Sequence, residues 1–446
     1  MASTTQEMAS SSSMEDDARK VSSDGHVSPA EIAIGVVIGR ASEAFDFFVY
    51  GIACILVFPA LVFPFVDQLT GTLYSFAIFG LAFIVRPIGT VLFMEVDRRH
   101  GRGVKLTIAL FLLGGSTAAI AFLPGYETIG AWSILALVVF RAGQGFALGG
   151  AWDGLASLLA LNVPESKRGW YAMLPQMGGP IGFFVASALF AFFVLNLSTA
   201  DFLDWGWRYP FFVAFTINVV ALFARLRLIA TEEFVQLFDS RDLKPVRVFE
   251  LLREQGRAIL LGAFVPLAGF ALFHLVTIFP LSYIDIFSDR STGEFLITQM
   301  GGAALCLVCT ALSGIVADKI GRRTLLGICA VAIAVFSIAT PFLLGGGSEG
   351  QTAFVYIGFA LLGFAHGQAA GSVASNFSSQ NRYTGSALTA DLAWLLGAGF
   401  APLVALGFSS QFGLVAVGVY LFSGAACTLA ALAYNKRMGL RDSGAS

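Results

Sequence analysis

The chain has 446 residues, of which 57% are hydrophobic and only 13% are charged, whereas about 25% of the residues of an ordinary soluble chain are charged. The mean hydropathy of +0.78, the 49 glycines and the 43 phenylalanines are typical of helices packed together in lipid. This composition excludes a soluble enzyme, and the near balance of 27 Lys and Arg with 29 Asp and Glu gives no sign of a nucleic-acid-binding surface.

The uncharged stretches of the chain predict where its helices lie, because about 18 or more successive apolar residues can cross a membrane as a helix. In front of the first stretch, residues 1–30 are polar, rich in serine and without the apolar segment of a signal peptide, so we expect a disordered tail. The stretches and the charge-bearing segments between them predict twelve helices, at residues 31–58, 71–96, 104–124, 131–160, 169–196, 209–230, 257–287, 295–317, 324–345, 352–376, 384–408 and 412–434.

The basic residues predict the orientation of these helices, since Lys and Arg collect in cytoplasmic loops. The loops after even-numbered helices, in which we include Arg225, and the two termini together hold 22 basic residues. The opposite loops hold only Arg208 and Arg290. We therefore expect both termini and the polar connection at residues 231–256 in the cytoplasm.

A repeat divides the chain into two similar parts. Asp97-Arg98-Arg99-His100-Gly101-Arg102 follows the second predicted helix, and a stretch from Gly314 to Arg323 follows the eighth, so that Gly101 and Gly321 lie 220 residues apart. Two six-helix halves of the same orientation suit a transporter that opens alternately to the two sides of a membrane. The predicted organisation is an N-terminal tail (1–30), a first half (31–230), a cytoplasmic linker (231–256), a second half (257–434) and a C-terminal tail (435–446).

These loops and several helical motifs resemble the major facilitator superfamily, and in particular its metabolite:proton symporter family. The motifs are Gly39-Arg-Ala-Ser-Glu43-Ala-Phe-Asp46-Phe-Phe-Val-Tyr50-Gly51, Arg86-Pro87-Ile-Gly89, Gln144-Gly145 with Gly149-Gly150, Asp204-Trp-Gly-Trp-Arg208-Tyr-Pro-Phe and Arg382-Tyr-Thr-Gly385. The resemblance implies an all-α membrane protein with twelve transmembrane helices in two pseudo-symmetric halves, in the inner membrane of a bacterium. It also implies proton-coupled uptake of a small polar metabolite, since the family contains importers of dicarboxylates, tricarboxylates, shikimate, proline and betaines.

The chain departs from the family pattern at two places. Met94 and Arg98 stand where the family usually has Gly and Asp, so the first half is expected to be held less firmly at its cytoplasmic end than the second, unless Asp97 substitutes. The fourth helix continues Gly-Gly-Ala-Trp-Asp, ending at Asp153, where the family usually continues Gly-Gly-Glu. The expected cytoplasmic gate comprises Asp97, Arg98, Arg102, Asp318, Arg322 and Arg323.

The gate residues of the second loop have a physical role of their own. Asp318 can cap the start of a helix, Gly321 permits a tight turn, and Arg322 and Arg323 can bind carbonyls or acids of a neighbouring helix. The alternative is that the positive charges only set the topology, and both interpretations can hold together.

The first helix presents several polar side chains on one face, because Arg40, Glu43 and Asp46 follow at intervals of three and Tyr50 stays on the same side. Ionisable groups inside a membrane are costly and usually face a cavity or a partner. We expect Arg40 and Tyr50 to contact the substrate, and Glu43 and Asp46 to couple protons, with Asp46 as the carrier. The alternative is that Arg40 and Glu43 only neutralise each other.

Four further charged residues of the predicted helices are candidates for function. Arg141 is the strongest candidate for binding a substrate carboxylate, since its planar guanidinium matches that group. Arg86 is a second candidate, although its side chain could instead reach the membrane interface. Asp153 lies about 18 Å further toward the cytoplasm than Arg141, which favours a gate or proton role. Asp391 is the deep acid of the second half and a candidate for proton coupling.

Other conspicuous residues have plainer interpretations. Gly143, Gly145, Gly149 and Gly150 predict close helix packing and not a nucleotide loop, and His274 and His366 are expected to be packed, hydrogen-bonded histidines. Asp285, near the outer end, is expected to be solvated. Cys306 and Cys309 form a CxxC pair in an uncharged apolar stretch, so we expect no metal and no cofactor.

The three arginines inside predicted helices favour an anionic substrate. We therefore expect proton-coupled import of a small organic acid, a mono- or dicarboxylate. A proton symporter of a zwitterion such as proline or a betaine, and a substrate sensor that no longer transports, are the alternatives. An ATP-driven pump is excluded because no GxxxxGK[ST] motif occurs. The expected partners are a small molecule, protons and the lipid bilayer, with no nucleic acid, and the protein is expected to be a monomer.

Overall fold

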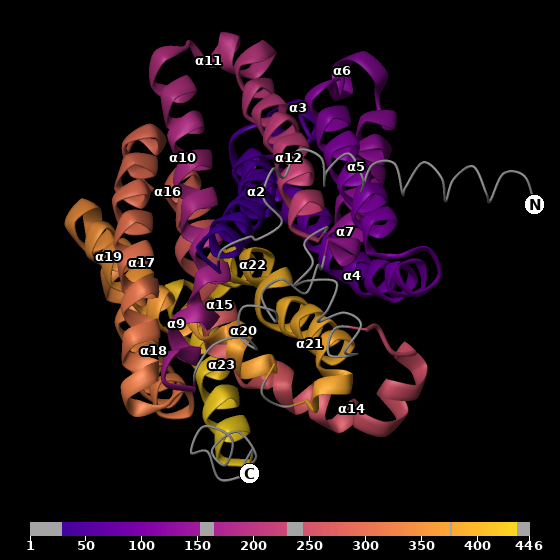
Figure 1. Ribbon diagram of the computed structural model, residues 1–446. Helices are drawn as coiled ribbons and strands as arrows, with labels where there is room; N and C mark the ends of the chain where they lie inside the picture. The colour runs from indigo at the N-terminus through magenta and orange to yellow at the C-terminus, as the bar shows by residue number, and fades with distance from the viewer. Residues whose placement is uncertain (1–28, 152–164, 230–243, 375–376, 435–446) are drawn as a thin grey trace, which may run out of the picture.

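The computed structural model describes residues 29–151, 165–229, 244–374 and 377–434, and the regular elements in these ranges are helices (Figure 1). The predicted tails and Asp153 lie outside the described residues, apart from the start of the first helix at Pro29. The first helix set comprises α2 (Pro29–Leu56), α3 (Phe58–Leu61), α4 (Gln68–His100), α5 (Arg102–Ala121), α6 (Tyr126–Ile129), α7 (Trp132–Gly150), the short turn η1 (Glu165–Lys167), α9 (Arg168–Met173), η2 (Leu174–Met177), α10 (Gly178–Asn196), α11 (Thr199–Asp201), the π-helical turn η3 (Phe202–Gly206) and α12 (Arg208–Ile229).

The second helix set follows residue 244. It comprises α14 (Val248–Phe264), α15 (Leu267–Thr277), α16 (Phe279–Phe287), α17 (Thr292–Ile320), α18 (Arg322–Leu344), α19 (Gly347–Gly367), α20 (Ala369–Ala374), α21 (Ser379–Ala393), the π-helical turn η4 (Trp394–Gly399), α22 (Ala401–Phe412) and α23 (Leu414–Tyr434). The two sets meet where α10 packs on α17, and where α4 packs on α21, η4 and α22.

Every predicted helical segment contains a helix or a series of helices. Eleven helical segments of the described residues are long and apolar enough to cross a membrane. The helix α2 is not among these eleven, and it carries Arg40, Glu43 and Asp46 within seven residues. It nevertheless packs inside the first set, between α10 and α12, so its charges have protein neighbours and not lipid.

The sequence prediction missed the breaks within two long segments. The segment 257–287 is divided into three helices, and Pro266 and Pro280 stand at the two boundaries. Proline lacks the N–H that would continue the hydrogen-bond series of a helix. The segment 384–408 is divided by η4, which Pro402 follows closely. In addition, α14 begins at Val248, inside the stretch that was predicted to be a loop up to residue 256.

Glycines bring the backbones of α4 and α7 into direct contact, as expected from their pattern in the sequence. A Cβ added to Gly149 would clash with the backbones of Arg86 and Thr90, and one added to Gly145 would clash with the backbone of Ala82. Gly89 on α4 meets the backbone of α7 in the same way. This packing fixes the position of α4 along its axis against α7, and therefore the positions of Arg86 and Thr90 in the first helix set.

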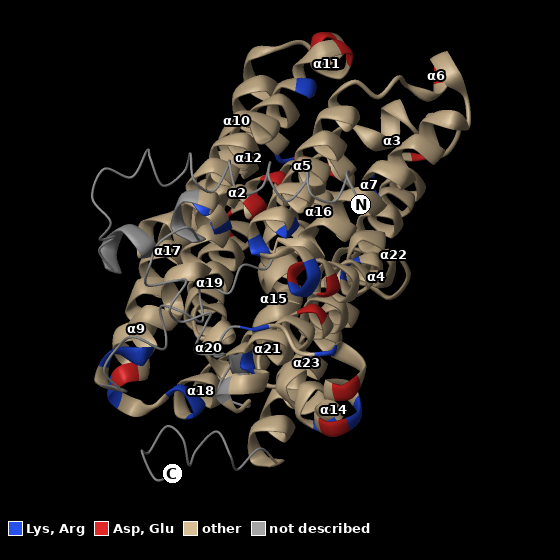
Figure 2. Cartoon of the chain, turned by 45° about the vertical axis from the view of Figure 1, so that its right-hand side comes forward, with Lys and Arg blue, Asp and Glu red and all other residues tan. Residues whose placement is uncertain are grey.

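The two repeated loops have the same backbone conformation. Gly101 ends α4 with φ +86° and Gly321 ends α17 with φ +84°, a region that favours glycine. Asp97 and Asp318 are consequently placed in the last turns of α4 and α17. We call the end of the bundle that holds these two turns, α9 and α14 the basic end, because Lys and Arg positions, blue on the ribbon of Figure 2, gather there. The opposite end carries α3, α6 and α11.

Candidate functional site

A cavity of about 140 Å³ lies where the two helix sets meet. Residues of α2, α4, α7, η2 and α10 from the first set line it, together with residues of α15, α19, α20, α21 and η4 from the second. Its wall is mostly aromatic or small, and its aromatic residues are Phe47, Phe48, Phe83, Phe270, Phe273 and Trp394. Its polar residues are Arg40, Glu43, Arg86, Gln176 and His366.

Glu43 lies between two arginines on one side of this cavity. Its Oε2 accepts a hydrogen bond from Arg40 Nη1 at 2.9 Å, and its Oε1 accepts one from Arg225 Nη2 at 2.5 Å. Arg225 belongs to α12, is 2% exposed and also donates to the carbonyl of Ala151 at 3.1 Å. The assignment of Arg225 to a loop was therefore wrong, and its place inside the predicted helix 209–230 was the signal that could have identified it.

Arg86 and Asp391 form an ion pair that joins the two helix sets. Arg86 Nε on α4 lies 2.7 Å from Asp391 Oδ1 on α21, and the Thr90 hydroxyl donates to Asp391 Oδ2. Arg86 lines the cavity and does not extend to the membrane interface. The sequence suggested both residues as candidates but gave no sign that they contact each other.

A chain of hydrogen bonds runs from Arg141 to Asp46 inside the first helix set. Arg141 Nη1 donates to Gln144 Oε1 at 3.0 Å, Gln144 Nε2 donates to the Thr117 hydroxyl at 2.9 Å, and Thr117 lies 2.7 Å from Asp46 Oδ1. Asp46 is 3% exposed and has no Lys, Arg or His nitrogen of the described residues within 4 Å. It is thus a buried acid held by a hydroxyl and not by a cation.

Arg141 does not line the cavity in this conformation, contrary to the sequence-based expectation. Its guanidinium carbon lies 4.1 Å from the ring centroid of Tyr50, 4.8 Å from that of Phe79 and 5.2 Å from that of Phe47. Its remaining hydrogen bonds go to the carbonyl of Phe79 at 3.3 Å. Tyr50 is likewise fully buried and away from the cavity. Three aromatic faces satisfy the cation here, and Phe47 lies between it and the cavity.

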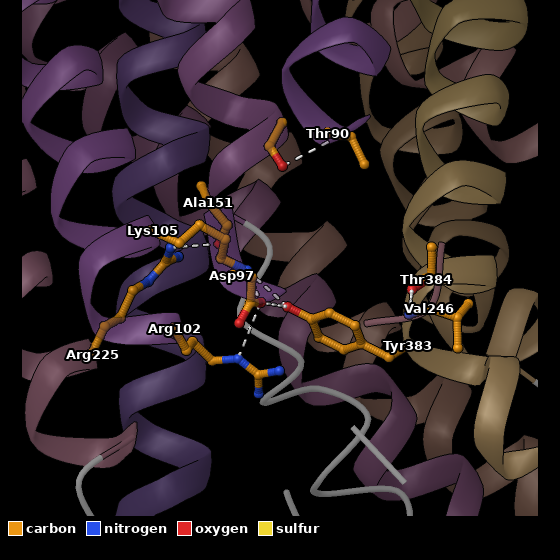
Figure 3. A network of polar contacts seen from close by, with 10 residues as sticks. Thr90, Asp97, Arg102, Lys105, Ala151, Arg225, Val246, Tyr383 and Thr384 are labelled. Carbon is orange, nitrogen blue, oxygen red and sulfur yellow. Dashed lines mark hydrogen bonds and ion pairs between the residues drawn. The ribbon is translucent and has the colours of Figure 1, made fainter. Parts of the chain in front are cut away.

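Asp97 is the centre of a polar cluster at the basic end (Figure 3). Its Oδ2 accepts hydrogen bonds from Lys105 Nζ at 2.9 Å and from the Tyr383 hydroxyl at 3.0 Å, and Arg102 Nε lies 3.5 Å away. Figure 3 shows Tyr383 reaching Asp97 from the opposite helix set. This geometry favours the alternative that Asp97 substitutes for the missing acid. The sequence pattern did not indicate that Lys105 and Tyr383 are its partners.

Arg98 lies outside this cluster. It donates to Glu95 on its own helix at 2.9 Å and 2.7 Å, and both side chains are exposed. The expectation that Arg98 takes part in contacts between the helix sets is therefore not met in this conformation. A surface pair within one helix contributes little to holding two helix sets together.

The second repeated loop makes the contacts that its sequence predicted. Asp318 accepts hydrogen bonds from the backbone N–H groups of Gly169 at 2.6 Å and Trp170 at 3.1 Å, so it caps the start of α9 in the other helix set. Arg322 Nη1 donates to the carbonyl of Gly371 at 3.0 Å, and Arg323 Nη2 donates to the carbonyl of Leu432 at 2.8 Å.

The remaining polar residues are packed in different ways. His274 is fully buried and stacks on Phe47 with centroids 5.2 Å apart, whereas His366 reaches the cavity. Asp285 accepts hydrogen bonds from Gln68 at 2.6 Å and from Thr292 at 3.1 Å, so protein groups hold it. Within the described residues, no group of three or more His, Cys, Asp or Glu side chains is placed to hold a metal.

Comparison with known proteins gives the family of the chain. The profile of the Major Facilitator Superfamily matches residues 44–402. The inner membrane metabolite transport protein YhjE of Escherichia coli strain K12 is 35% identical over 408 residues, which cover 90% of this chain and 93% of that protein. The shikimate transporter of the same strain is 31% identical over 411 residues, covering 90% and 92%.

Two further comparisons agree with this relationship. A proline/betaine transporter of the same strain is 26% identical over 381 residues, covering 82% of this chain and 75% of that one. The crystal structure of a D-xylose-proton symporter superimposes with a TM-score of 0.69 over 91% of this chain and 97% of that chain, at 19% identity, which shows a shared fold. The chain is therefore a transporter and not an enzyme, and it belongs to the major facilitator superfamily, in the metabolite:proton symporter group.

Proposed function

We propose that this protein imports a small organic acid, a mono- or dicarboxylate, together with protons. The cavity between the helix sets is the observation that carries the proposal. Arg40 and Arg86 line it, and its other walls are mainly aromatic or small. Each of these arginines contacts an acid of the protein, and a guanidinium also binds the carboxylate of a small molecule through paired hydrogen bonds.

The proton-coupling part of the proposal rests on the partners of the buried acids. Glu43 and Asp391 are held in ion pairs, which favour their charged forms. Asp46 accepts a hydrogen bond from Thr117 and has no cation of the described residues within 4 Å. Protonating Asp46 therefore costs less free energy than protonating Glu43 or Asp391. Asp46 is therefore the proposed proton carrier, and its hydrogen-bonded chain to Arg141 provides a way for its protonation to affect the neighbouring helices.

The transport cycle in this proposal is alternating access between two six-helix halves. Contacts between Asp97 and Tyr383, and between Asp318 and the start of α9, close the basic end. We place this end and both termini in the cytoplasm, because basic residues gather there. The name of the relative YhjE supports placing the protein in a bacterial inner membrane, where it would act as a monomer.

The aromatic wall favours one alternative function. A quaternary ammonium group binds well among aromatic faces, and six aromatic side chains line the cavity. A zwitterion such as proline or glycine betaine would place its carboxylate on an arginine and its cationic group among the rings. This alternative takes the same cavity but a substrate of different charge.

Transport in proteoliposomes separates the two functions. The purified protein is reconstituted, an inward proton gradient is imposed, and uptake of labelled succinate, shikimate, benzoate, proline and glycine betaine is measured. We expect accumulation of at least one of the three acids, abolished by a protonophore and by Arg86→Gln. Accumulation of proline or glycine betaine with none of the acids would replace the proposal by its alternative.

A further inference from the structure

Arg86 presents the terminal part of its guanidinium to the cavity. Its Nε lies 2.7 Å from Asp391 Oδ1, while Nη1 and Nη2 make no hydrogen bond with the described part of the chain. The side chain is 14% exposed and lines the cavity. The two nitrogens that best match a carboxylate are therefore available to a molecule in the cavity, while the inner side of the same cation is already in contact with a carboxylate of the protein.

Small residues leave room beside this ion pair. Ala82 lies about one turn before Arg86 on α4, and Ala390 directly precedes Asp391 on α21, and both line the cavity. Asp391 also accepts a hydrogen bond from the Thr90 hydroxyl, and Thr90 lies on the same helix as Arg86, so this hydroxyl helps to hold the acid beside the cation.

An aromatic pair stands next to the ion pair. Phe83 precedes Arg86 by three residues, Trp394 follows Asp391 by three, and their rings are stacked with centroids 6.1 Å apart at an interplanar angle of 23°. Because α4 and α21 run in opposite directions, both rings lie about one turn further from the basic end than the charged pair. A carboxylate on Arg86 would therefore have flat apolar surface directly beside it.

We infer that Asp391 is a built-in competitor of the substrate: the carboxylate of a ring-shaped or flat monocarboxylate binds Arg86 and displaces Asp391 from it. This inference rests on the proposed function and names the binding residue, the competing residue and the substrate class. The displacement breaks the Arg86 contact between α4 and α21, the helices that Asp97 and Tyr383 also join at the basic end. Occupation of the cavity consequently weakens the contacts that hold α4 and α21 together, and this coupling is reciprocal.

Binding measurements on the full chain test the competition. Affinities for benzoate and shikimate, and for succinate as a dicarboxylate comparison, are measured by calorimetry on the purified protein and on the variants Asp391→Asn, Thr90→Val, Arg86→Gln and Arg86→Gln/Asp391→Asn. We expect Asp391→Asn to bind benzoate or shikimate about tenfold more tightly, because the competitor has lost its charge. Thr90→Val should also bind more tightly, by a smaller factor, because Asp391 is then held less firmly beside Arg86.

The remaining variants complete the test. Arg86→Gln should weaken binding at least tenfold, and the double variant should equal Arg86→Gln, because competition requires the cation. Glu294→Gln, an exposed acid at the start of α17, is the matched control and should bind as the unmodified chain does. A structural role of Asp391 alone would weaken binding and would not tighten it.

Each failure has a separate meaning. Unchanged or weaker binding by both Asp391→Asn and Thr90→Val, with the acid still bound by the unmodified chain, overturns the inference and leaves the proposed function intact. If neither the unmodified chain nor Asp391→Asn binds benzoate, shikimate or succinate, the proposed function falls and the inference falls with it.

Discussion

Asp46 and Asp391 are buried acids and Glu43 is a partly buried one, and the partners of the three differ in kind. Glu43 is shared by two arginines, Asp391 contacts one arginine and a hydroxyl, and Asp46 contacts a hydroxyl. A carboxylate held by cations keeps its charge, whereas a buried carboxylate away from cations gives it up at a smaller cost. We therefore expect substitution of Glu43 to reduce stability and substitution of Asp46 to reduce proton-driven accumulation.

Asp46→Asn mimics a permanently protonated carrier. We expect this variant to lose uphill accumulation driven by a proton gradient, while it still exchanges labelled for unlabelled substrate at equal concentrations. Glu43→Gln is the comparison, since it leaves Arg40 and Arg225 without their shared acid. It should lower the free energy of unfolding by about 3–5 kcal/mol, the usual cost of breaking a buried pair, and with it the expression level. Full proton-driven accumulation in Asp46→Asn would show that another group carries the proton.

Arg141→Lys tests the position of Arg141 behind the aromatic wall. Lysine keeps the charge but loses the planar stacking on Tyr50 and the directed bond to Gln144, so the free energy of unfolding should fall by about 1–3 kcal/mol. Substrate affinity should stay within about threefold, because Phe47 separates residue 141 from the cavity. Calorimetry and thermal unfolding measure both quantities, and a tenfold loss of affinity at unchanged stability would place Arg141 in the substrate site.

At the scale of the helices, α4 joins most of the features described above. Phe83, Arg86, Thr90 and Asp97 lie at successive heights along it, and each contacts the second helix set. Its other face packs on the glycines of α7. Any shift of α4 against α7 would therefore move all of these contacts together. The contacts between the helix sets thus depend on the spacing of α4 and α7.

Gly149→Ala should disturb that spacing. The added methyl group would meet the backbones of Arg86 and Thr90, so we expect the free energy of unfolding to fall by about 1–3 kcal/mol, as for other overpacked sites. Gly115→Ala on α5 is the matched control, because nothing lies within 4 Å of the added Cβ and alanine favours a helix by up to about 1 kcal/mol. Thermal unfolding in detergent compares them, and equal effects would remove the close packing of α4 and α7 from the explanation.

The sequence predicted contacts within a helix better than contacts between helices. Uncharged runs located the helices, and the spacing of Arg40 and Glu43 suggested, as an alternative, the pairing that the structure shows, because residues three apart share a helix face. Arg86 and Asp391 are 305 residues apart, and no spacing rule relates such residues. The position of Arg141 was missed for the same reason, since Phe79 and Tyr50 cover it from two other helices.

For the whole molecule, contacts between the helix sets at the basic end are spread over two regions. Asp97 meets Tyr383 where α4 approaches α21, and Asp318 meets the start of α9 where α17 approaches the first set. The two aspartates lie in equivalent turns of the repeat. Each uses a different kind of donor, since Asp97 accepts from side chains and Asp318 accepts from backbone N–H groups.

Asp97→Asn and Asp318→Asn should therefore open the basic end to a similar degree, a revision of the expectation that the first region is the weaker. The measurement is the rate at which a thiol reagent added on the basic side alkylates the variant Ala390→Cys. Cys427→Ala is added to remove background, because Cys427 is only partly buried whereas the other four cysteines are buried. Glu95→Gln, two residues from Asp97 and bonded to Arg98 and Arg99 on its own helix, should leave alkylation unchanged. Much faster alkylation in Asp318→Asn alone would restore the original expectation.

The surroundings of Asp46 also determine the electrical behaviour of the protein. A single proposed proton carrier, Asp46, suits one proton per cycle, and a proton accompanying a monocarboxylate carries no net charge across the membrane. Uptake of benzoate or shikimate should then be indifferent to membrane voltage, whereas a proton with a zwitterion would gain about 2.3 kcal/mol per 100 mV. Proteoliposomes clamped with valinomycin and potassium at equal pH on both sides measure this directly, and voltage-driven uptake of either acid would require a second proton and hence a second carrier.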